Sequence, residues 1–400
     1  MKMTHMMAQN GNSRRIMLVF IFLALLVGGL FLWQRPSPPI TAQAALLPLL
    51  SQTDTAGFAR ATEPNAIQFP RDLGPHPDYQ TEWWYYTGNL EGENGRLFGY
   101  QLTIFRRALT PTTPHSALPT PHSDWRTNQV YLAHFTLSDI ANGDFYPHER
   151  FSRGAAGLAG AQAEPYRVWL EDWSITETAP GVVRLQADGR DAALDLTLTQ
   201  TMPPVLHGNG GLSPKGDEPG NASYYYSIIR QETAGTVRVG DETIDVTGLS
   251  WKDHEYSTSA LGANAVGWDW FSLQLDNGGG LMLFQIRNAD GRLEPFSSGS
   301  YIAPDGAITH LELADFDITV LDTWTSPVSG GKYPAGWHIR IPKLDLDLEG
   351  RPLMPNQELN VSTTYWEGAV EFSGTLAGRP LTAQGYIELT GYAGSMNGRL

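Results

Sequence analysis

Apolar and polar side chains alternate along most of this chain in short runs, with the two-residue period of a strand rather than the 3.6-residue period of a helix. Runs of this kind, each bounded by Gly, Pro, Asn or Asp, predict antiparallel strands. In the first half they lie at 81–90, 97–106, 129–138, 167–170, 182–186, 193–201, 223–230 and 236–239. In the second half they lie at 268–275, 280–288, 298–303, 310–318, 338–341, 345–348, 365–373 and 384–391. Long helical patterns are almost missing, so the sequence predicts an all-β protein.

About eight short strands in each half suit a closed or nearly closed antiparallel barrel, whose interior holds packed side chains or one small ligand. An internal echo supports two consecutive barrel domains. The stretch from Glu82 to Arg106 resembles the stretch from Asp269 to Arg287, each with an acidic residue and a Trp at its start. The echo has two explanations. Either the chain contains two copies of one domain, or two unrelated β-hairpins have similar sequences by chance.

The N-terminus carries a membrane-targeting segment. Residues 16–33 are eighteen consecutive uncharged and mostly apolar positions, preceded by Arg14 and Arg15. This length lies between a secretory signal and a spanning helix, so both an uncleaved anchor and a cleaved signal stay open, with the anchor favoured. The positive-inside rule then places all that follows outside the cytoplasm. We expect four parts: a signal or anchor at 1–35, a linker at 36–60, and domains at 61–257 and 258–400.

Composition excludes several classes of function. The chain has no cysteine, so a disulfide framework, a thiolate metal site and a Cys nucleophile are excluded. Beyond residue 35 there are 23 basic against 42 acidic residues, a formal charge of −19. This balance argues against nucleic acid and against anionic lipid surfaces as partners, and solubility alone also explains it.

The segment 74–90 (GPHPDYQTEWWYYTGNL) crowds a His, two carboxylates and several aromatic rings onto the entry to one strand. Glu82 lies among rings, where an unpaired charge is costly. Either Glu82 is hydrogen-bonded as a structural anchor, which is the favoured interpretation, or it points into a cavity. Two irregular stretches, 110–126 and 203–220, are rich in Pro or Gly and are either lids over a barrel mouth or plain surface loops.

The segment 251–257 (WKDHEYS) is the sharpest candidate for chemistry. In a strand, Trp251, Asp253 and Glu255 share one face. Two carboxylates beside an aromatic ring raise one another's pKa through repulsion and desolvation, and a carboxylic acid that stays protonated at neutral pH can act as a general acid. The alternative is a charge-paired corner between the barrels, with His254 hydrogen-bonded to backbone.

Other chemistries lack their motifs. The only compact His and carboxylate spacing is at 253–255, where adjacent side chains point apart in a strand, so no metal site is predicted. The G-x-S-x-G elbow of serine hydrolases and the glycine patterns of nucleotide-binding loops do not occur. No cofactor is predicted.

Several separated motifs resemble the AttH and carotenoid 1,2-hydratase family of lipocalin-like proteins. They are the segments 69–72 (FPRD), 74–76 (GPH), 81–85 (TEWWY), 98–106 (FGYQLTIFR), 133–135 (AHF), 225–227 (YYS) and 251–257 (WKDHEYS), in this order within residues 61–400. The resemblance implies two lipocalin-like domains. It also implies, for the hydratase branch, an Asp that protonates a carbon–carbon double bond before water adds. The layout is closer to the AttH branch, so it does not imply a carotenoid as substrate.

The matching position for that acid is Asp253. His254, Glu255 and Tyr226 complete the predicted catalytic group. The predicted ligand-binding residues, in the first barrel or beside it, are His134, Glu82, Trp84, Trp251 and Trp270.

Two functions stay open. One is an exported hydratase or cyclase that protonates an apolar alkene held in the first barrel. The other is a non-enzymatic carrier of a hydrophobic small molecule that works with an envelope transporter. The expected location is the periplasmic side of the cytoplasmic membrane if the segment is kept, and the periplasm or exterior if it is cleaved.

Overall fold

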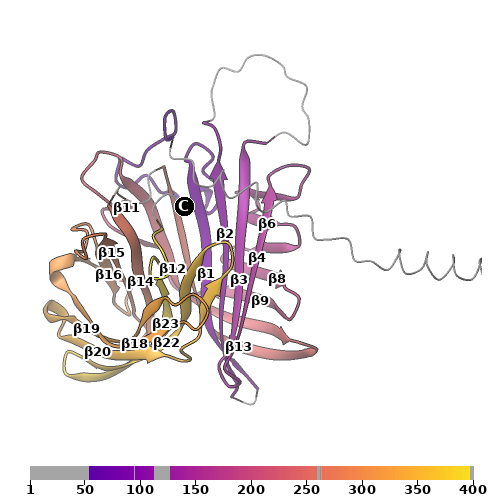
Figure 1. Ribbon diagram of the computed structural model, residues 1–400. Helices are drawn as coiled ribbons and strands as arrows, with labels where there is room; N and C mark the ends of the chain where they lie inside the picture. The colour runs from indigo at the N-terminus through magenta and orange to yellow at the C-terminus, as the bar shows by residue number, and fades with distance from the viewer. Residues whose placement is uncertain (1–53, 94, 112–126, 259–261, 263, 397–400) are drawn as a thin grey trace, which may run out of the picture. The chain divides into compact units, whose positions relative to one another are not determined.

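The computed structural model describes residues 54–93, 95–111, 127–258, 262 and 264–396. They form two antiparallel β-sheets, the first coloured indigo to salmon and the second salmon to yellow (Figure 1). The predicted all-β class and the two barrel-like sheets are confirmed. Helical structure in the described part is limited to three short 3-10 turns, η1 (Arg71–Leu73), η2 (Leu313–Asp315) and η3 (Pro342–Leu344). The predicted membrane segment lies outside the described residues, and no helix within them is long and apolar enough to span a bilayer.

The first sheet has 13 strands. They are β1 (Thr81–Gly92), β2 (Leu97–Ala108), β3 (Gln129–Asp139), β4 (Asp144–Arg153), β5 (Ala159–Gln162), β6 (Arg167–Leu170), β7 (Trp173–Ala179), β8 (Val182–Asp188), β9 (Ala192–Gln200), β10 (Val205–Leu206), β11 (Leu212–Pro214), β12 (Ala222–Val239) and β13 (Glu242–Ser257). The path runs β4-β3-β2-β1-β13-β12-β9-β8-β7-β6-β5, with β10 and β11 paired to β12. The last strand in sequence, β13, therefore pairs with the first.

The second sheet has 10 strands. They are β14 (Ala265–Leu275), β15 (Gly280–Asn288), β16 (Ser298–Ile302), β17 (Ile308–Glu312), β18 (Asp317–Thr325), β19 (Lys332–Ile341), β20 (Leu346–Pro352), β21 (Glu358–Asn360), β22 (Thr364–Leu376) and β23 (Arg379–Leu389). The path runs β17-β16-β15-β14-β23-β22-β20-β19-β18, with β21 paired to β22. Here too the last strand, β23, pairs with the first, β14.

The prediction of about eight strands per half was too low. It missed β4, whose side chains are partly exposed along most of its length, and β18, whose side chains are mostly exposed, because neither has a clear apolar alternation. It also split β12 near Gly235, which has a φ of +154° and packs so closely on Asp195 that a Cβ would lie 2.2 Å from its carbonyl oxygen. Glycine therefore continues this strand where the sequence pattern indicated a break.

The echoed hairpins occupy corresponding places in their sheets and hold the same kind of ion pair. Arg106 donates to Glu82 at 2.8 Å between β2 and β1, and Arg287 donates to Asp269 at 3.0 Å between β15 and β14. The described residues of both sheets belong to one compact unit. The division at residue 258 stays a prediction.

Three of the four apolar clusters of the described residues show how strand alternation divides the core. Trp84 and Tyr86 on β1 point into the interior of the first sheet, which aromatic and aliphatic side chains fill. A second core fills the second sheet around Trp337. Tyr85, between Trp84 and Tyr86, points the other way into a third core that both sheets share, with Trp251 and Trp270. The side chains that meet between the sheets are thus the odd-numbered ones of β1.

Candidate functional site

A cavity with a strongly aromatic lining lies between the two sheets, whereas the prediction placed the ligand inside the first barrel. The volume of this cavity is about 120 Å³. Its position follows from the alternation of β1: Trp84 and Tyr86 fill the interior of the first sheet, so the side chains on the other face of β1, Trp83 and Tyr85, line the cavity. The wall is rich in aromatic side chains, among them Trp83, Tyr85 and Tyr225 from the first sheet and Trp268, Trp270 and Tyr365 from the second. An apolar cavity of about 150 Å³ accommodates benzene, so this space suits one ring-sized part of a ligand.

Asp253 on β13 is in the wall of this cavity and is 4% exposed. Its Oδ1 accepts hydrogen bonds from the Trp251 indole N–H at 2.7 Å and from the Ser227 hydroxyl. Its Oδ2 accepts one from the Tyr225 hydroxyl at 2.9 Å. The prediction that Trp251, Asp253 and Glu255 share one face of the strand is confirmed. The indole of Trp251 orients the Asp253 carboxyl through its hydrogen bond.

Burial raises the pKa of Asp253 to about 7, although the hydrogen bonds from Ser227, Trp251 and Tyr225 act in the opposite direction. Desolvation outweighs these hydrogen bonds, and the charge of Glu255 acts in the same direction as desolvation. A substantial fraction of Asp253 is therefore protonated at neutral pH, as a general acid requires.

A buried histidine stands behind Asp253. The Nε2 atom of His207 lies 2.6 Å from the Ser227 hydroxyl, and its Nδ1 lies 3.0 Å from the Ser300 hydroxyl on β16 of the second sheet. Burial lowers the pKa of His207 to about 3, so the ring is neutral. With Ser227 donating to an ionised Asp253, His207 donates through Nε2 and accepts from Ser300 through Nδ1. This chain of donors is directed at Asp253.

Glu255 lies two residues along β13 and also lines the cavity. It accepts a hydrogen bond from Ser223, and the Lys215 ammonium lies 3.1 Å from its Oε1. Lys215 is 4.2 Å from the centroid of the Phe284 ring. The stretch 203–220 thus provides Lys215 of the cavity wall and His207 behind it, which argues against the interpretation as a plain surface loop.

Glu388 on β23 lines the cavity from the second sheet, and the sequence analysis did not predict it. It accepts a hydrogen bond from the Trp268 indole at 3.2 Å. Burial raises its pKa to about 7, against that hydrogen bond and with the help of the Asp253 and Glu255 charges. Its neighbours in sequence form an ordinary amphipathic strand, so no local motif could have indicated it.

His134 lies in the cavity wall, as predicted for a ligand-binding residue. Its Nδ1 is 2.7 Å from the Tyr365 hydroxyl of the second sheet, and its Nε2 is 3.1 Å from Glu149. Trp270 also lines the cavity and donates its indole N–H to Tyr225 at 3.0 Å. Trp251 lies in the core beneath and reaches the site only through Asp253.

Four predicted residues do not join this site, which corrects the proposed grouping. His254 and Tyr226 are adjacent to Asp253 and to Tyr225 in sequence, so in a strand their side chains point to the opposite face. There the Tyr226 hydroxyl lies 2.9 Å from the His254 Nδ1. Glu82 and Trp84 point the same way, whereas Trp83 and Tyr85 face the cavity.

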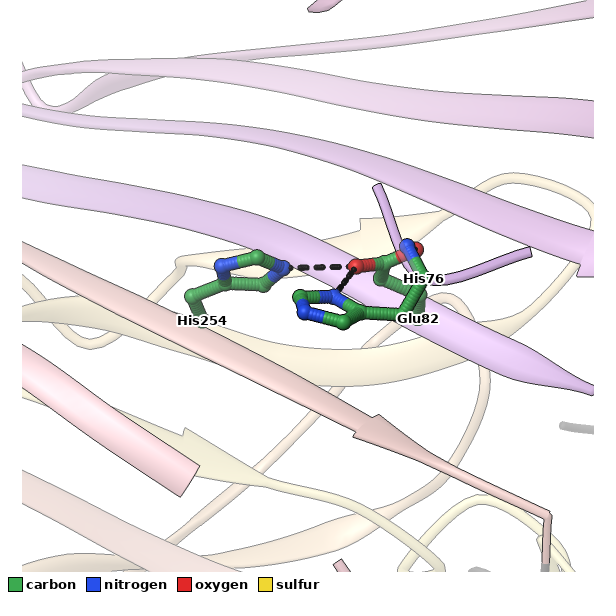
Figure 2. Close-up of side chains that lie close together, drawn as sticks. All are labelled: His76, Glu82 and His254. Carbon is green, nitrogen blue, oxygen red and sulfur yellow. Dashed lines mark hydrogen bonds and ion pairs between the residues drawn. The ribbon is translucent and has the colours of Figure 1, made fainter. Parts of the chain in front are cut away.

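Glu82 is an anchor, the favoured of the two interpretations. Figure 2 shows its carboxylate between two imidazoles, with His76 Nδ1 at 2.7 Å and His254 Nε2 at 2.8 Å from Oε1. Arg106 donates to Oε2 at 2.8 Å. Burial opposes ionisation, but Arg106 and the two imidazoles hold the pKa of Glu82 well below its usual range. The fully buried charge is therefore compensated.

The ligand atoms of His76, Glu82 and His254 lie within 4.8 Å of one another, the donor types of a zinc site. Sequence spacing missed this group because β1 and β13 bring it together, with Glu82 opposite Tyr256 in the ladder. Both imidazoles are hydrogen-bonded to the same carboxylate oxygen, and the Arg106 guanidinium adds a positive charge beside it. As they stand, these side chains form a closed hydrogen-bonded group.

Lys252, next to Asp253, is 1% exposed and also points into the first sheet. Its ammonium lies 4.7 Å from the centroid of the Tyr166 ring and 3.2 Å from the Tyr226 hydroxyl. Burial lowers its pKa to about 7. Lys252 and Asp253 ordinarily carry opposite charges at neutral pH. Here both have a pKa of about 7, and their side chains lie on opposite faces of β13.

Two antiparallel barrel-like sheets with an aromatic, acid-bearing cavity between them define a lipocalin-like protein. The family model described as AttH-like matches residues 60–392, so the chain belongs to the AttH-like family, and the recognition from sequence is confirmed. A crystal structure of a Nitrosomonas europaea protein designated AttH is 34% identical, with a TM-score of 0.74, covering 84% of this chain and all of that one. A search of curated proteins gave no match.

Two more distant structures share the fold. Kievitone hydratase from Nectria haematococca is 14% identical, with a TM-score of 0.62, covering 84% of this chain and 98% of that one. CghA in complex with Sch210972 is 12% identical, with a TM-score of 0.50, covering 85% of this chain and 98% of that one. At these identities the likeness is one of fold.

Proposed function

We propose that this protein is a hydratase or cyclase that acts on an apolar alkene, with Asp253 as the acid that protonates the double bond. The observation that carries the proposal is the placement of Asp253, a buried carboxyl with a pKa of about 7 in the wall of an aromatic cavity. The named hydratase among proteins of the same fold gives the reaction class its precedent.

The reaction balances without a cofactor. The Asp253 proton is transferred to one alkene carbon, the π electrons form the new C–H bond, and the other carbon becomes a cation while Asp253 becomes a carboxylate. In hydration, water adds to the cation and its surplus proton returns to Asp253. In cyclisation, a second double bond attacks the cation, and the new cation then loses a proton from a neighbouring carbon to the Asp253 carboxylate, which forms a double bond and restores the acid. Ser227, backed by His207, holds the carboxylate oxygen at the moment it gains charge.

The test uses the full-length chain in detergent. Mass spectrometry first identifies a bound alkene, either among the small molecules that co-purify with the protein or after incubation of the protein with a panel of acyclic isoprenoid alkenes. The protein is then incubated with this alkene in D₂O, and mass spectrometry shows whether a carbon atom of the alkene gains deuterium. We expect Asp253→Asn to lower deuterium incorporation by about 10²-fold or more, the usual contribution of a general acid, while binding is kept. Asp241→Asn, at an exposed turn, is the matched control. Equal incorporation in the wild type and in Asp253→Asn would refute the acid role.

The carrier function stays the second candidate because the cavity wall is largely apolar and would hold an apolar ligand without any chemistry. A carrier would bind the same molecule in both proteins and label it in neither. Both proposals include export of the protein. In both, residues 16–33 are either kept as an anchor, for the carrier beside a transporter, or removed. Protease protection of the full-length protein in spheroplasts tests it.

A further inference from the structure

We propose that Glu388 is a second functional carboxyl of the cavity and that it gives the cavity a preference for apolar ligands that carry a positively charged centre. This inference deepens the proposed function and rests on it for the choice of site. It would extend the role of the cavity from holding an alkene to stabilising the cation that protonation creates.

The topology places Asp253 and Glu388 on corresponding strands. In each sheet the last strand pairs with the first, so β13 lies beside β1 and β23 beside β14. Asp253 is opposite Tyr85 in the first ladder, and Glu388 is opposite Trp270 in the second. The rings of Tyr85 and Trp270 meet edge to face, with centroids 5.1 Å apart. Each sheet thus delivers one carboxyl to the same aromatic junction.

Glu388 has a carboxyl neighbour instead of a cation. Glu367 on β22 is its direct partner across the ladder and is fully buried. Neither oxygen of Glu367 has a hydrogen bond of ordinary geometry within the described part of the chain, and the same holds for the Tyr85 hydroxyl, which faces the cavity. Burial and the Glu388 charge raise the pKa of Glu367 well above its usual range, while the Tyr85 and Tyr365 hydroxyls lower it in part.

The positive charge near this group is already in use. Among the described residues no Lys, Arg or His forms an ion pair with Glu388 or Glu367, and Lys215 is paired with Glu255 at 3.1 Å. His134 is paired with Glu149. Among the described residues, the other ionisable groups in the lining of the cavity are Lys215, Glu255, His134, Asp253, Tyr85, Tyr225 and Tyr365. The carboxyls therefore have to stay protonated or receive a cation from a ligand.

The aromatic wall favours the same kind of ligand. A cation within about 6 Å of a ring face is attracted by the ring quadrupole, most strongly by Trp. Trp83, Trp268 and Trp270 all line the cavity. Burial raises the pKa of Glu388 to about 7, so a bound cation would lower this pKa and release a proton. Affinity for a permanent cation should therefore increase as the pH rises through about 7.

The experiment compares two probes of the same shape, benzyltrimethylammonium and neopentylbenzene, which differ only in charge. Binding to the full-length protein is followed by tryptophan fluorescence and by calorimetry at pH 6 and pH 8. We expect the cation to bind roughly ten-fold or more tightly than the neutral probe, and its advantage to grow with pH. Glu388→Gln should remove most of this advantage and leave the affinity for neopentylbenzene unchanged, and Glu349→Gln, at an exposed position, should change neither.

A second variant keeps the test informative if Glu388→Gln does not fold. Trp268→Phe removes the indole that donates to Glu388, so the pH midpoint of cation binding should move upward. Equal affinity for the two probes, no binding of either, or an equal loss of both in Glu388→Gln would overturn the inference. These outcomes are distinct from failure of the proposed function, which is measured by deuterium incorporation in Asp253→Asn.

Discussion

The raised pKa of Asp253 makes a prediction about stability that needs no substrate. Asp253→Asn keeps the size of the side chain and removes its charge. Asp253 titrates near its ordinary value of 3.8 when unfolded and near 7 when folded. Between these values the native state holds a proton that the unfolded state has lost, so the free energy of unfolding falls as the pH rises, and the loss is nearly complete by about pH 8.

The size of the effect follows from the two pKa values. A difference of about 3 units corresponds to roughly 4 kcal/mol in full, of which roughly 2.5 kcal/mol falls between pH 5 and pH 8. The wild type should therefore lose about 2.5 kcal/mol more than Asp253→Asn over this interval. Carboxyls whose pKa does not depend on Asp253 titrate alike in both proteins and cancel in the comparison. The Asp253 charge contributes to the raised pKa of Glu388, so Glu388 should titrate at a lower pH in Asp253→Asn.

Urea unfolding followed by tryptophan fluorescence at pH 5, 6, 7 and 8 measures both proteins. Asp241→Asn, at an exposed turn, should follow the wild type throughout. If the wild type and Asp253→Asn run parallel within about 0.5 kcal/mol across the range, Asp253 titrates as an ordinary exposed carboxyl. The argument for a protonated acid at neutral pH would then be wrong.

Three further variants test the surroundings of this strand. Glu82→Gln should lower the free energy of unfolding by roughly 3–5 kcal/mol, because it leaves the Arg106 charge buried without its partner, and an unfolding curve like that of Glu349→Gln would contradict the anchor role. Lys252→Met should stabilise the protein at pH 7 by up to about 4 kcal/mol, since the amine has a pKa of about 7 when folded and 10.5 when unfolded. Between pH 7 and about pH 10.5 the free energy of unfolding of the wild type should rise, so that the difference from Lys252→Met disappears at the upper end. A constant difference between the two proteins from pH 7 to pH 10 would show that Lys252 does not titrate in this way. Ser227→Ala should raise the pKa of Asp253 above about 7, because it removes a hydrogen bond that favours the ionised form, and a downward shift in carboxyl ¹³C chemical-shift titrations would contradict the assigned donor.

The class of fold and the chemistry of one strand could be predicted from local patterns. Strand periodicity and turn residues act over a few positions, so alternation alone placed Asp253 and Glu255 on one face and His254 on the other. The same rule puts Tyr226 on the face opposite Tyr225 and Trp84 on the face opposite Trp83, so the predicted placement of Tyr226 and Trp84 in the site was wrong. The signal that would have corrected both was present in the sequence.

Other features depend on which strands become neighbours. Glu388 and Glu367 meet across β23 and β22, and His76 meets His254 through the pairing of β1 with β13. Their partners lie far away in sequence, and ladder register is decided by the burial of whole faces.

The sequence by itself determined an all-β chain, an acidic strand at 251–257 and membership of a family, because these depend on residue types and short spacings. Only the tertiary structure decided that the cavity lies between two sheets and that it receives one carboxyl from each. The physical reason is packing. Rings such as Trp84 fill the interior of the first sheet. The side chains on the other face of the same strand therefore line the cavity together with side chains of the second sheet. The carboxyls of this wall come from strands far apart in sequence, so no single segment indicates that they meet.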